Sequence, residues 1–265
     1  MKIIDTHVHV FPDSLEPHAI ATLSGPERHA QIHGTVDATI ERMRRLGVAS
    51  SWTVPVATKA AQVATINTFA ATQDRRYFVP FGAMHPDVEN AYGLLATYRD
   101  RGLPGFKLHP DFEDVRPTDP RMQPLYDAAM DFDLICYFHA GDDVGPHSCN
   151  GSPTEFAAVL DAYPGIKMVL AHAGGFRLWD EVEELLVGRD VYFDTAYTPG
   201  QAPTEQLMRI ICNHGTGKVL FGSDSPWTRL EDDIAFFMGR DELSGADKEA
   251  LFHGNAENLL QLAGW

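Results

Sequence analysis

Short apolar runs alternate along this chain with longer segments in which apolar residues recur at helical spacing. The apolar runs predict eight strands, near residues 2–9, 48–55, 77–84, 104–108, 134–139, 166–171, 190–194 and 218–223. A strand followed by a helix, repeated eight times, is typical of a closed parallel barrel. We therefore expect an α/β fold in which residues 1–265 form one domain, a single distorted (β/α)8 barrel.

Capping residues mark where several of the intervening helices begin and end. Ser152 stands before a proline, and Glu155 follows at the position for a capping box, so a helix should begin there. Two arginines followed by Gly47 predict a helix C-terminus. Ser244 and Asp247 predict the start of a final helix. The residues expected to pack this helix against the body are Leu251, Leu259, Leu260 and Leu262.

Two connections are too long to be simple turns. They cover residues 10–34, after the first strand, and residues 140–151, after the fifth, where His147 lies. Both begin where a strand ends, and in a parallel barrel the C-terminal ends of the strands form the catalytic face. We expect these two segments to shape or cover a substrate pocket.

Composition and charge narrow the choice of partner. With 44% hydrophobic and 22% charged residues, the chain has the composition of a soluble globular protein. Its net charge of -16 argues against nucleic acid or an anionic membrane, because either would need a basic patch. Three widely spaced cysteines fit neither a disulfide framework nor a zinc motif, and no apolar run approaches the ~18 residues of a membrane helix. We expect a cytoplasmic protein that acts on a small molecule.

Candidate chemistry begins at His7 and His9, near the end of the first predicted strand. Side chains two positions apart on a strand point to the same face, so both imidazoles can reach one metal ion. Further polar residues stand at the ends of later apolar runs, namely Lys107, His139, His172 and Asp224. Neutral imidazole and carboxylate are the ligands that zinc-type ions prefer. The pattern therefore predicts a metal centre assembled from several strand ends.

Taken in order, these motifs resemble the amidohydrolase superfamily. They are most similar to its amidohydrolase-related branch, which contains hydrolases, lactonases and non-oxidative decarboxylases similar to aminocarboxymuconate semialdehyde decarboxylase. The matching segments are DTHVH at residues 5–9, GFKLHP at 105–110, FHAG at 138–141, AHAGG at 171–175 and FGSDSP at 221–226. The resemblance covers nearly the whole chain, and it implies a TIM barrel with a metal-dependent activity.

The resemblance also implies roles for these residues. His7, His9, His139 and Asp224 would hold a divalent ion, expected to be zinc, which would activate water. Asp224 would then accept the proton of that water. His172 would be either an acid/base beside the ion or a ligand of a second one.

Lys107 leaves the number of ions open. In binuclear relatives similar to phosphotriesterase, a carboxylated lysine at the end of the fourth strand bridges two ions, and Lys107 matches that position. The decarboxylase-like branch works with one ion, and a plain ammonium at Lys107 would instead attract a substrate carboxylate. His109 lies on the same strand face. We expect Lys107 and His109 to bind substrate beside one tightly held ion, with a second ion as the alternative.

Three functional hypotheses follow. The first is a metal-dependent hydrolase that activates water against an ester, lactone or amide carbonyl. The second is a metal-dependent lyase, a non-oxidative decarboxylase or hydratase of a carboxylated aromatic or dienoic acid. The third is a metal-binding scaffold without turnover. By resemblance, the expected assembly is a homodimer.

Overall fold

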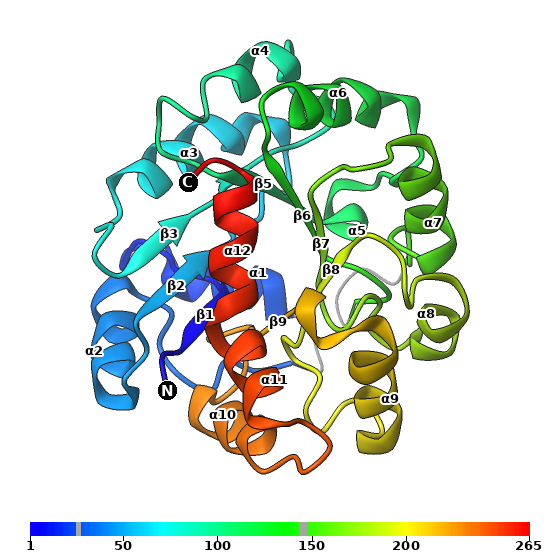
Figure 1. Cartoon of the computed structure of the whole chain (residues 1–265). Coiled ribbons are helices and arrows are strands. Elements are labelled where there is room, and N and C mark those ends of the chain that lie inside the picture. Colours follow the sequence, from blue (N-terminus) through cyan, green and yellow to red (C-terminus); the bar gives the residue numbers. More distant parts are fainter. Residues whose placement is uncertain (25–27, 144–147) are drawn as a thin grey trace.

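A computed structural model describes residues 1–24, 28–143 and 148–265, and its helices surround a central ring of strands (Figure 1). The described strands are β1 (Ile4–Val8), β2 (Ser50–Thr53), β3 (Phe78–Pro80), β4 (Gly82–Ala83), β5 (Gly105–Leu108), β6 (Ile135–Phe138), β7 (Met168–Leu170), β8 (Tyr192–Asp194) and β9 (Val219–Leu220). The described α-helices are α1 (Glu16–Ser24), α2 (Val36–Leu46), α3 (Val63–Thr72), α4 (Ala91–Ala96), α5 (Pro110–Glu113), α6 (Gln123–Asp131), α7 (Pro153–Ala162), α8 (Trp179–Leu185), α9 (Thr204–His214), α10 (Leu230–Met238), α11 (Gly245–Glu249) and α12 (Asn255–Leu262).

The strands pair in parallel and follow the order of the chain. β1, β2 and β3 form one sheet, and β4 to β9 form another. The sheets meet at Phe81, between β3 and β4, whose N–H donates to Thr53 O at 2.9 Å. On the other side, Thr6 N–H donates to Phe221 O at 2.8 Å, which joins β1 to the segment after β9. The strands therefore close into the predicted barrel.

Each of the eight predicted strand regions contains a strand, and region 77–84 contains both β3 and β4. The largest difference lies in region 218–223, where only Val219 and Leu220 form strand β9. The next residue, Phe221, donates its N–H to Leu251 O at 3.0 Å instead of to a neighbouring strand. The chain thus leaves the ladder early and turns toward β1.

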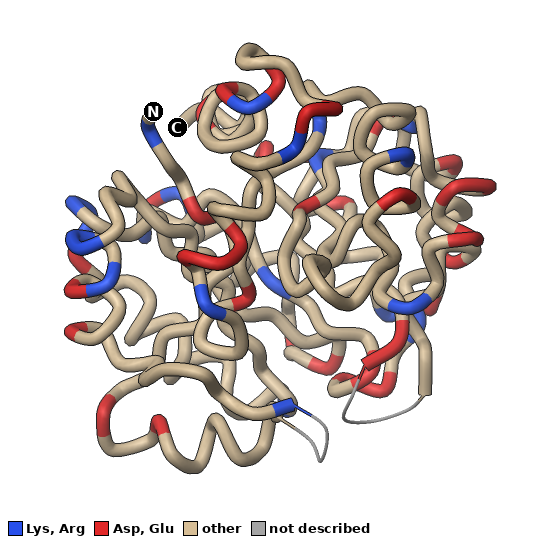
Figure 2. The backbone as a smooth tube through the Cα atoms, turned by 90° about the horizontal axis from the view of Figure 1, so that it is seen from below, with Lys and Arg blue, Asp and Glu red and all other residues tan. Residues whose placement is uncertain are grey.

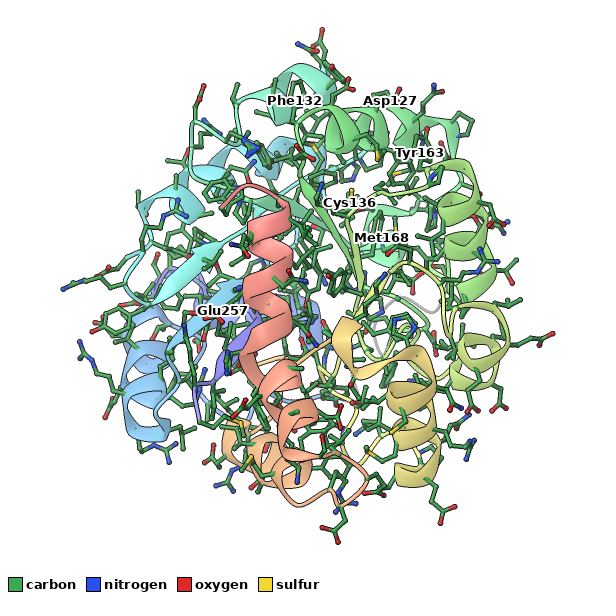
Figure 3. All side chains as sticks on the ribbon, viewed as in Figure 1. Asp127, Phe132, Cys136, Tyr163, Met168 and Glu257 are labelled. Atoms are coloured by element: carbon green, nitrogen blue, oxygen red, sulfur yellow. The ribbon has the colours of Figure 1, made fainter. Side chains whose placement is uncertain are left out.

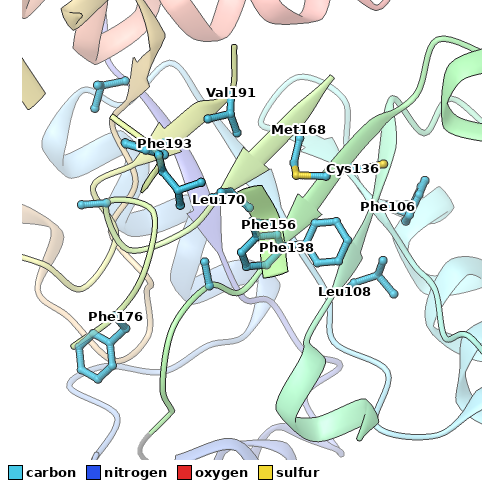
Figure 4. Packing of buried hydrophobic residues seen from close by; sticks show 14 of the residues in the cluster. Phe106, Leu108, Cys136, Phe138, Phe156, Met168, Leu170, Phe176, Val191 and Phe193 are labelled. Carbon is cyan, nitrogen blue, oxygen red and sulfur yellow. The ribbon is translucent and has the colours of Figure 1, made fainter. Parts of the chain in front are cut away.

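Alternation along the strands separates two apolar clusters. In β6, Ile135 and Tyr137 pack inside the barrel with Phe81. The intervening Cys136 and Phe138 face the surrounding helices, in the cluster shown in Figure 4. Figure 3 shows the side chains of those helices around the strands. Burial on both faces explains why the strand sequences are almost continuously apolar.

The predicted helix signals are mostly confirmed. Ser152 Oγ accepts a hydrogen bond from Glu155 N–H at 3.4 Å, and α7 begins there. The Glu155 carboxylate, however, accepts from Thr118 Oγ1, so no capping box forms at this helix. Gly47 ends α2 in the left-handed conformation, with φ of 70°.

The predicted final helix is interrupted. Ser244 and Asp247 form a capping box at α11, and a π-helical segment, Ala250–Gly254, separates α11 from α12. Leu251 and Leu259 are buried as predicted, but the prediction for Leu262 is wrong, because its side chain is 56% exposed. Ala263 is buried instead and packs with Leu259 inside the end of the barrel where the strands begin.

Figure 2 shows acidic and basic residues interspersed along the outer helices and loops. Among the described residues, no helix is both long and apolar enough to cross a membrane.

Candidate metal centre

The polar residues predicted at strand ends meet at one end of the barrel. All of them line one cavity, whose volume open to water-sized spheres is about 20 Å³. The lining comprises His7, His9, Leu23, Arg28, Val56, Lys107, His109, Phe112, His139, His172, Asp224 and Trp227. The cavity is therefore polar on the side of the strands and apolar or aromatic where Leu23 and Trp227 close it.

Three donor atoms converge on one side of this cavity. His7 Nε2 lies 3.2 Å from His9 Nε2, and Asp224 Oδ1 lies 3.4 Å and 3.1 Å from these two nitrogens, respectively. All three side chains are buried. We call His7, His9 and Asp224 the convergent group. Ligand atoms about 2.0–2.2 Å from one ion lie about 3–3.5 Å apart, so these separations fit a shared metal ion.

The protonation of His7 supports this interpretation. His7 Nδ1 lies 2.7 Å from Asp194 Oδ2, and because a carboxylate only accepts, Nδ1 must carry the hydrogen. Burial lowers the pKa of His7 well below its usual value, so the ring is neutral and Nε2 presents a lone pair. That lone pair faces His9 Nε2 and an oxygen of Asp224. At most one hydrogen, on His9 Nε2, lies among these three atoms, whereas a cation could bind all three.

Asp224 is held in its ionised form. Burial alone would raise the pKa of Asp224, but a hydrogen bond from His9 and the charge of Arg28 hold it well below its usual range. Its backbone has φ of 68°, in the left-handed region that non-glycine residues seldom occupy. Asp224 N–H also donates to His7 O at 2.9 Å, which fixes the carboxylate beside β1.

A second buried group has the same composition. His109, His139 and Asp143 also bring one donor atom each within 4.8 Å of one another, so both groups are consistent with a divalent metal ion. His109 Nε2 lies 3.3 Å from Asp143 Oδ2. The rings of His109 and His139 are stacked, with centroids 4.0 Å apart and planes 10° apart. We call these three residues the stacked group.

The stacking makes a shared ion in the stacked group less favourable. An imidazole binds a metal along a lone pair that lies in the ring plane. Two nearly parallel rings 4.0 Å apart cannot both direct in-plane lone pairs at one ion unless a ring turns. The convergent group needs no such change, because His7 and His9 are tilted by 55° to each other.

His139 and His172 form a second contact between lone pairs. His172 Nδ1 donates to Ala196 O at 2.8 Å, and His139 Nε2 donates to Asp142 O at 2.9 Å. Their other nitrogens, His172 Nε2 and His139 Nδ1, face each other at 3.0 Å. Burial lowers the pKa of both imidazoles, so two lone pairs meet where a shared proton or a metal ion is favoured.

Two cationic side chains border the cavity. Lys107 Nζ is buried, has no hydrogen-bond partner among the described residues and lies 4.7 Å from the centre of the Tyr137 ring. Burial lowers the pKa of Lys107 to about 8. Arg28 lies 3.5 Å from Asp224 Oδ2 and 3.7 Å from Asp143 Oδ1, with its guanidinium 4.5 Å from the Trp227 ring centre.

The sequence located seven of these residues but missed three. His7, His9, Lys107, His109, His139, His172 and Asp224 all line the cavity as expected, and their assignment as ligands, catalytic residues or substrate contacts stays a prediction. The missed residues are Arg28, Asp143 and Asp194. Asp194 ends an apolar strand, as His139 does, so the same signal could have found it.

One long connection lines this cavity, and the other contacts lining residues through Asp143, which pairs with Arg28 and His109. Residues 10–34 include helix α1, which the sequence did not predict, and they contribute Leu23 and Arg28 to the lining. Asp142 and Asp143 belong to the other connection. Residues 25–27 and 144–147, including His147, lie outside the described residues.

A family model, described as amidohydrolase, matches residues 4–262. The matched range contains all five strand-end motifs and the strands of the barrel. The chain belongs to the amidohydrolase family. A comparison with curated proteins finds no match. Family membership agrees with the resemblance expected from the five strand-end motifs, and it makes this chain a metal-dependent type of enzyme whose specific reaction the family does not decide.

Solved structures similar to this amidohydrolase share its fold over almost the full length. A TIM-barrel protein from Bordetella bronchiseptica has 19% identity, full coverage of both chains and a TM-score of 0.80. A dihydroxybenzoic acid decarboxylase from Polaromonas sp., with bound manganese and 2-nitroresorcinol, has 17% identity, covers 98% of this chain and 97% of its own, and scores 0.70. A probable 2-pyrone-4,6-dicarboxylic acid hydrolase from Acinetobacter baumannii has 16% identity, coverage of 98% and 100%, and a score of 0.69.

Proposed function

We propose that this amidohydrolase is a metal-dependent hydrolase that directs water at an ester, lactone or amide carbonyl of a small molecule. The convergent group carries the proposal, because three buried acceptor atoms within 3.4 Å of one another share at most one hydrogen. His7, His9 and Asp224 would hold one divalent ion together with His139. His172 would serve as an acid/base beside the ion or as a ligand of a second one. Zinc is the proposed ion, and manganese is the alternative because a decarboxylase of the same fold contains it.

When bound, such an ion lowers the pKa of water and polarises the oxygen of the bond under attack. The protein supplies the remaining functions. The ionised Asp224 carboxylate is the proposed acceptor of the water proton. His172 lies on the other side of His7, with ring centroids 5.3 Å apart, where it can return a proton to the leaving group. Lys107 and His109 are the proposed substrate contacts.

A second candidate function is favoured by the two cations beside the centre. Lys107 Nζ and the Arg28 guanidinium border the same cavity, and a buried ammonium with no hydrogen-bond partner among the described residues suits an anionic substrate group. This arrangement would suit a non-oxidative decarboxylase or hydratase of a carboxylated aromatic or dienoic acid. Solved structures of the same fold include a decarboxylase and a probable hydrolase, so the fold admits both reactions.

The two reactions can be separated by their products. The purified protein, loaded with zinc or manganese, is incubated with a panel of lactones, esters and amides and a panel of hydroxylated aromatic and dienoic acids. Hydrolysis of an ester or lactone releases one acid equivalent per turnover in a pH-stat, and hydrolysis of an amide releases an amine, which chromatography detects. Decarboxylation instead releases carbon dioxide, which a coupled assay or mass spectrometry of a labelled carboxylate detects. We expect acid release without carbon dioxide.

Metal removal tests the role of the convergent group. Treatment with a chelator should abolish turnover, and adding back one equivalent of divalent ion should restore it. If the metal-free protein, or a variant with Asp224 replaced by asparagine, turned over at the normal rate, the proposed function would be wrong. Carbon dioxide as the product would instead establish the second candidate.

A further inference from the structure

We propose that Asp194 is a positioning residue that sets the tautomer of His7 and thereby the metal affinity of the centre. This inference rests on the proposed function only in assuming that the convergent group binds a divalent ion. Asp194 is the last residue of β8 and is fully buried. It does not line the cavity, so any effect on a metal ion must pass through another residue.

The Asp194 carboxylate is fully engaged by donors from three strand ends. Oδ2 accepts from His7 Nδ1 at 2.7 Å and from the Tyr137 hydroxyl at 2.5 Å. Oδ1 accepts from the backbone N–H groups of His172, at 2.8 Å, and Ala196, at 2.9 Å. A single side chain therefore links β1, β6 and the segment after β7.

The Asp194 carboxylate decides which nitrogen of His7 carries the hydrogen. Because both oxygens only accept, His7 Nδ1 must donate, and Nε2 is left as a lone pair toward His9 and Asp224. A carboxylate behind a ligating histidine fixes the ring orientation and raises its basicity as a ligand. Asp194 thus holds His7 in the tautomer that binds a cation, even when no ion is bound.

An asparagine at position 194 would favour the opposite tautomer of His7. The backbone N–H groups of His172 and Ala196 cannot become acceptors, so they hold the amide oxygen on their side. The amide NH2 group would then face His7 Nδ1, which would have to accept. His7 would carry its hydrogen on Nε2, in the space that a metal ion would need. The substitution changes one atom but reverses the direction of one buried hydrogen bond.

The experiment compares zinc affinity in Asp194→Asn with the wild type, by competition against a chromophoric chelator at fixed pH. Loss of the oriented partner of a ligating histidine weakens metal binding by about 10–100-fold, and we expect an increase of Kd in this range. The matched control is Tyr137→Phe, which removes another donor from the same carboxylate oxygen without offering His7 a new one. Its Kd should stay within about threefold of the wild type, because His7 keeps its tautomer.

A second measurement does not depend on metal binding. In metal-free protein labelled with ¹⁵N-histidine, the imidazole shifts of His7, assigned by comparison with His7→Gln, should report hydrogen on Nδ1 in the wild type and on Nε2 in Asp194→Asn. Hydrogen on Nε2 in the wild type, or an unchanged Kd in a folded Asp194→Asn protein, would overturn the inference. A wild type that binds no ion would refute the proposed function and the affinity effect together, whereas the shifts would still decide the tautomer.

Discussion

The convergent group and the stacked group contain the same ligands, two imidazoles and one carboxylate, and both are buried near the same cavity. They differ in the orientation of their rings. In the convergent group the planes are tilted by 55° and the two Nε2 atoms lie 3.2 Å apart. In the stacked group the planes are within 10° of parallel. Composition and proximity alone therefore do not define a metal site, since the lone pairs must also meet.

The difference between the two groups arises from the hydrogen bonds that orient their histidine rings. His7 is fixed through Nδ1 by the Asp194 carboxylate, which leaves its Nε2 directed at the other two members. His109 instead directs Nε2 at the Asp143 carboxylate of its own group, and stacks face to face on His139. In the first group a carboxylate outside the group orients a ligand, whereas in the second the other ring nitrogen of His109, Nδ1, has no hydrogen-bond partner among the described residues.

The largest expected effect is that of Asp224→Asn. An amide is a poorer metal ligand than a carboxylate and cannot accept the water proton, so the ion should be lost and turnover should fall by about 10³-fold or more. Metal content by inductively coupled plasma mass spectrometry and kcat of the remaining activity would be measured together. Full metal occupancy with normal turnover would show that the convergent group is not the metal site.

Asp143→Asn is the matched control in the stacked group. It makes the same chemical change, next to the same Arg28, in the group whose rings do not converge. The ion should be retained in full, and turnover should fall by only about 10–100-fold, since one charge-assisted hydrogen bond is worth about 1.5–3 kcal/mol. Loss of the ion here, with Asp224→Asn unaffected, would reverse the assignment of the two groups.

The next effect concerns Arg28, which contacts a carboxylate of each group. Arg28→Gln removes a cation next to Asp224 and Asp143, so binding of an anionic substrate or inhibitor should weaken by about 10–100-fold, as expected for a lost charge-assisted contact. Neutral esters of the same compound should bind as well as they do to the wild type. The ratio of KM values for the acid and its ester is the readout, and an unchanged ratio would exclude Arg28 from substrate recognition.

A smaller effect is expected for His109→Phe. The phenyl ring can keep the stack on His139 but cannot pair with Asp143, so metal content should be unchanged. Loss of one partner of a buried carboxylate should cost about tenfold in kcat/KM. Depletion of the ion in this variant, measured on protein whose circular dichroism matches the wild type, would mean that His109 is a ligand after all.

Most of the fold could be predicted from the sequence because the barrel strands leave a direct signal. Strands buried on both faces must be apolar throughout. A polar residue at the end of such a strand is therefore easy to recognise in the sequence. The splitting of one strand at Phe81 and the early end of β9 at Leu220 could not be predicted, because both depend on partners distant in sequence. Helix α1 was missed because its segment shows little helical amphipathicity.

The site was predictable where strand periodicity places it. His7 and His9 face the same cavity as strand alternation predicts, although β1 ends at Val8. Asp224 was found because it follows an apolar run, although β9 ends four residues before it. Arg28 and Asp143 were not found, since each lies in a long connection whose path depends on tertiary packing. The tautomer of His7 could not be read from its own motif, because its hydrogen-bond partner lies 187 positions away.

The buried Asp233 differs in its pKa from the carboxylates of the two groups. Hydrogen bonds from His9 and His109, together with the charge of Arg28, keep the pKa of Asp224 and Asp143 well below the usual range even though burial alone would raise it. Asp233, at the start of α10, has a hydroxyl hydrogen bond from Thr228 but faces like charges, and burial raises its pKa to about 7. Of these three buried carboxylates, only the two that face Arg28 and accept a hydrogen bond from an imidazole have a lowered pKa.

The last prediction follows from that raised pKa. The folded state binds more protons than the unfolded state between the unfolded pKa near 4 and about 7, so Asp233 costs stability as pH rises through this window, with the loss complete above about 7. Asp233→Asn carries no such penalty. Relative to the wild type, the variant should gain on the order of 2 kcal/mol in unfolding free energy between about pH 5.5 and about pH 8.5. Urea unfolding of the metal-free protein at both pH values measures this gain. The exposed neighbour variant Asp232→Asn should show a much smaller gain, and an equal response of both variants would mean that Asp233 is ionised like Asp224 and Asp143.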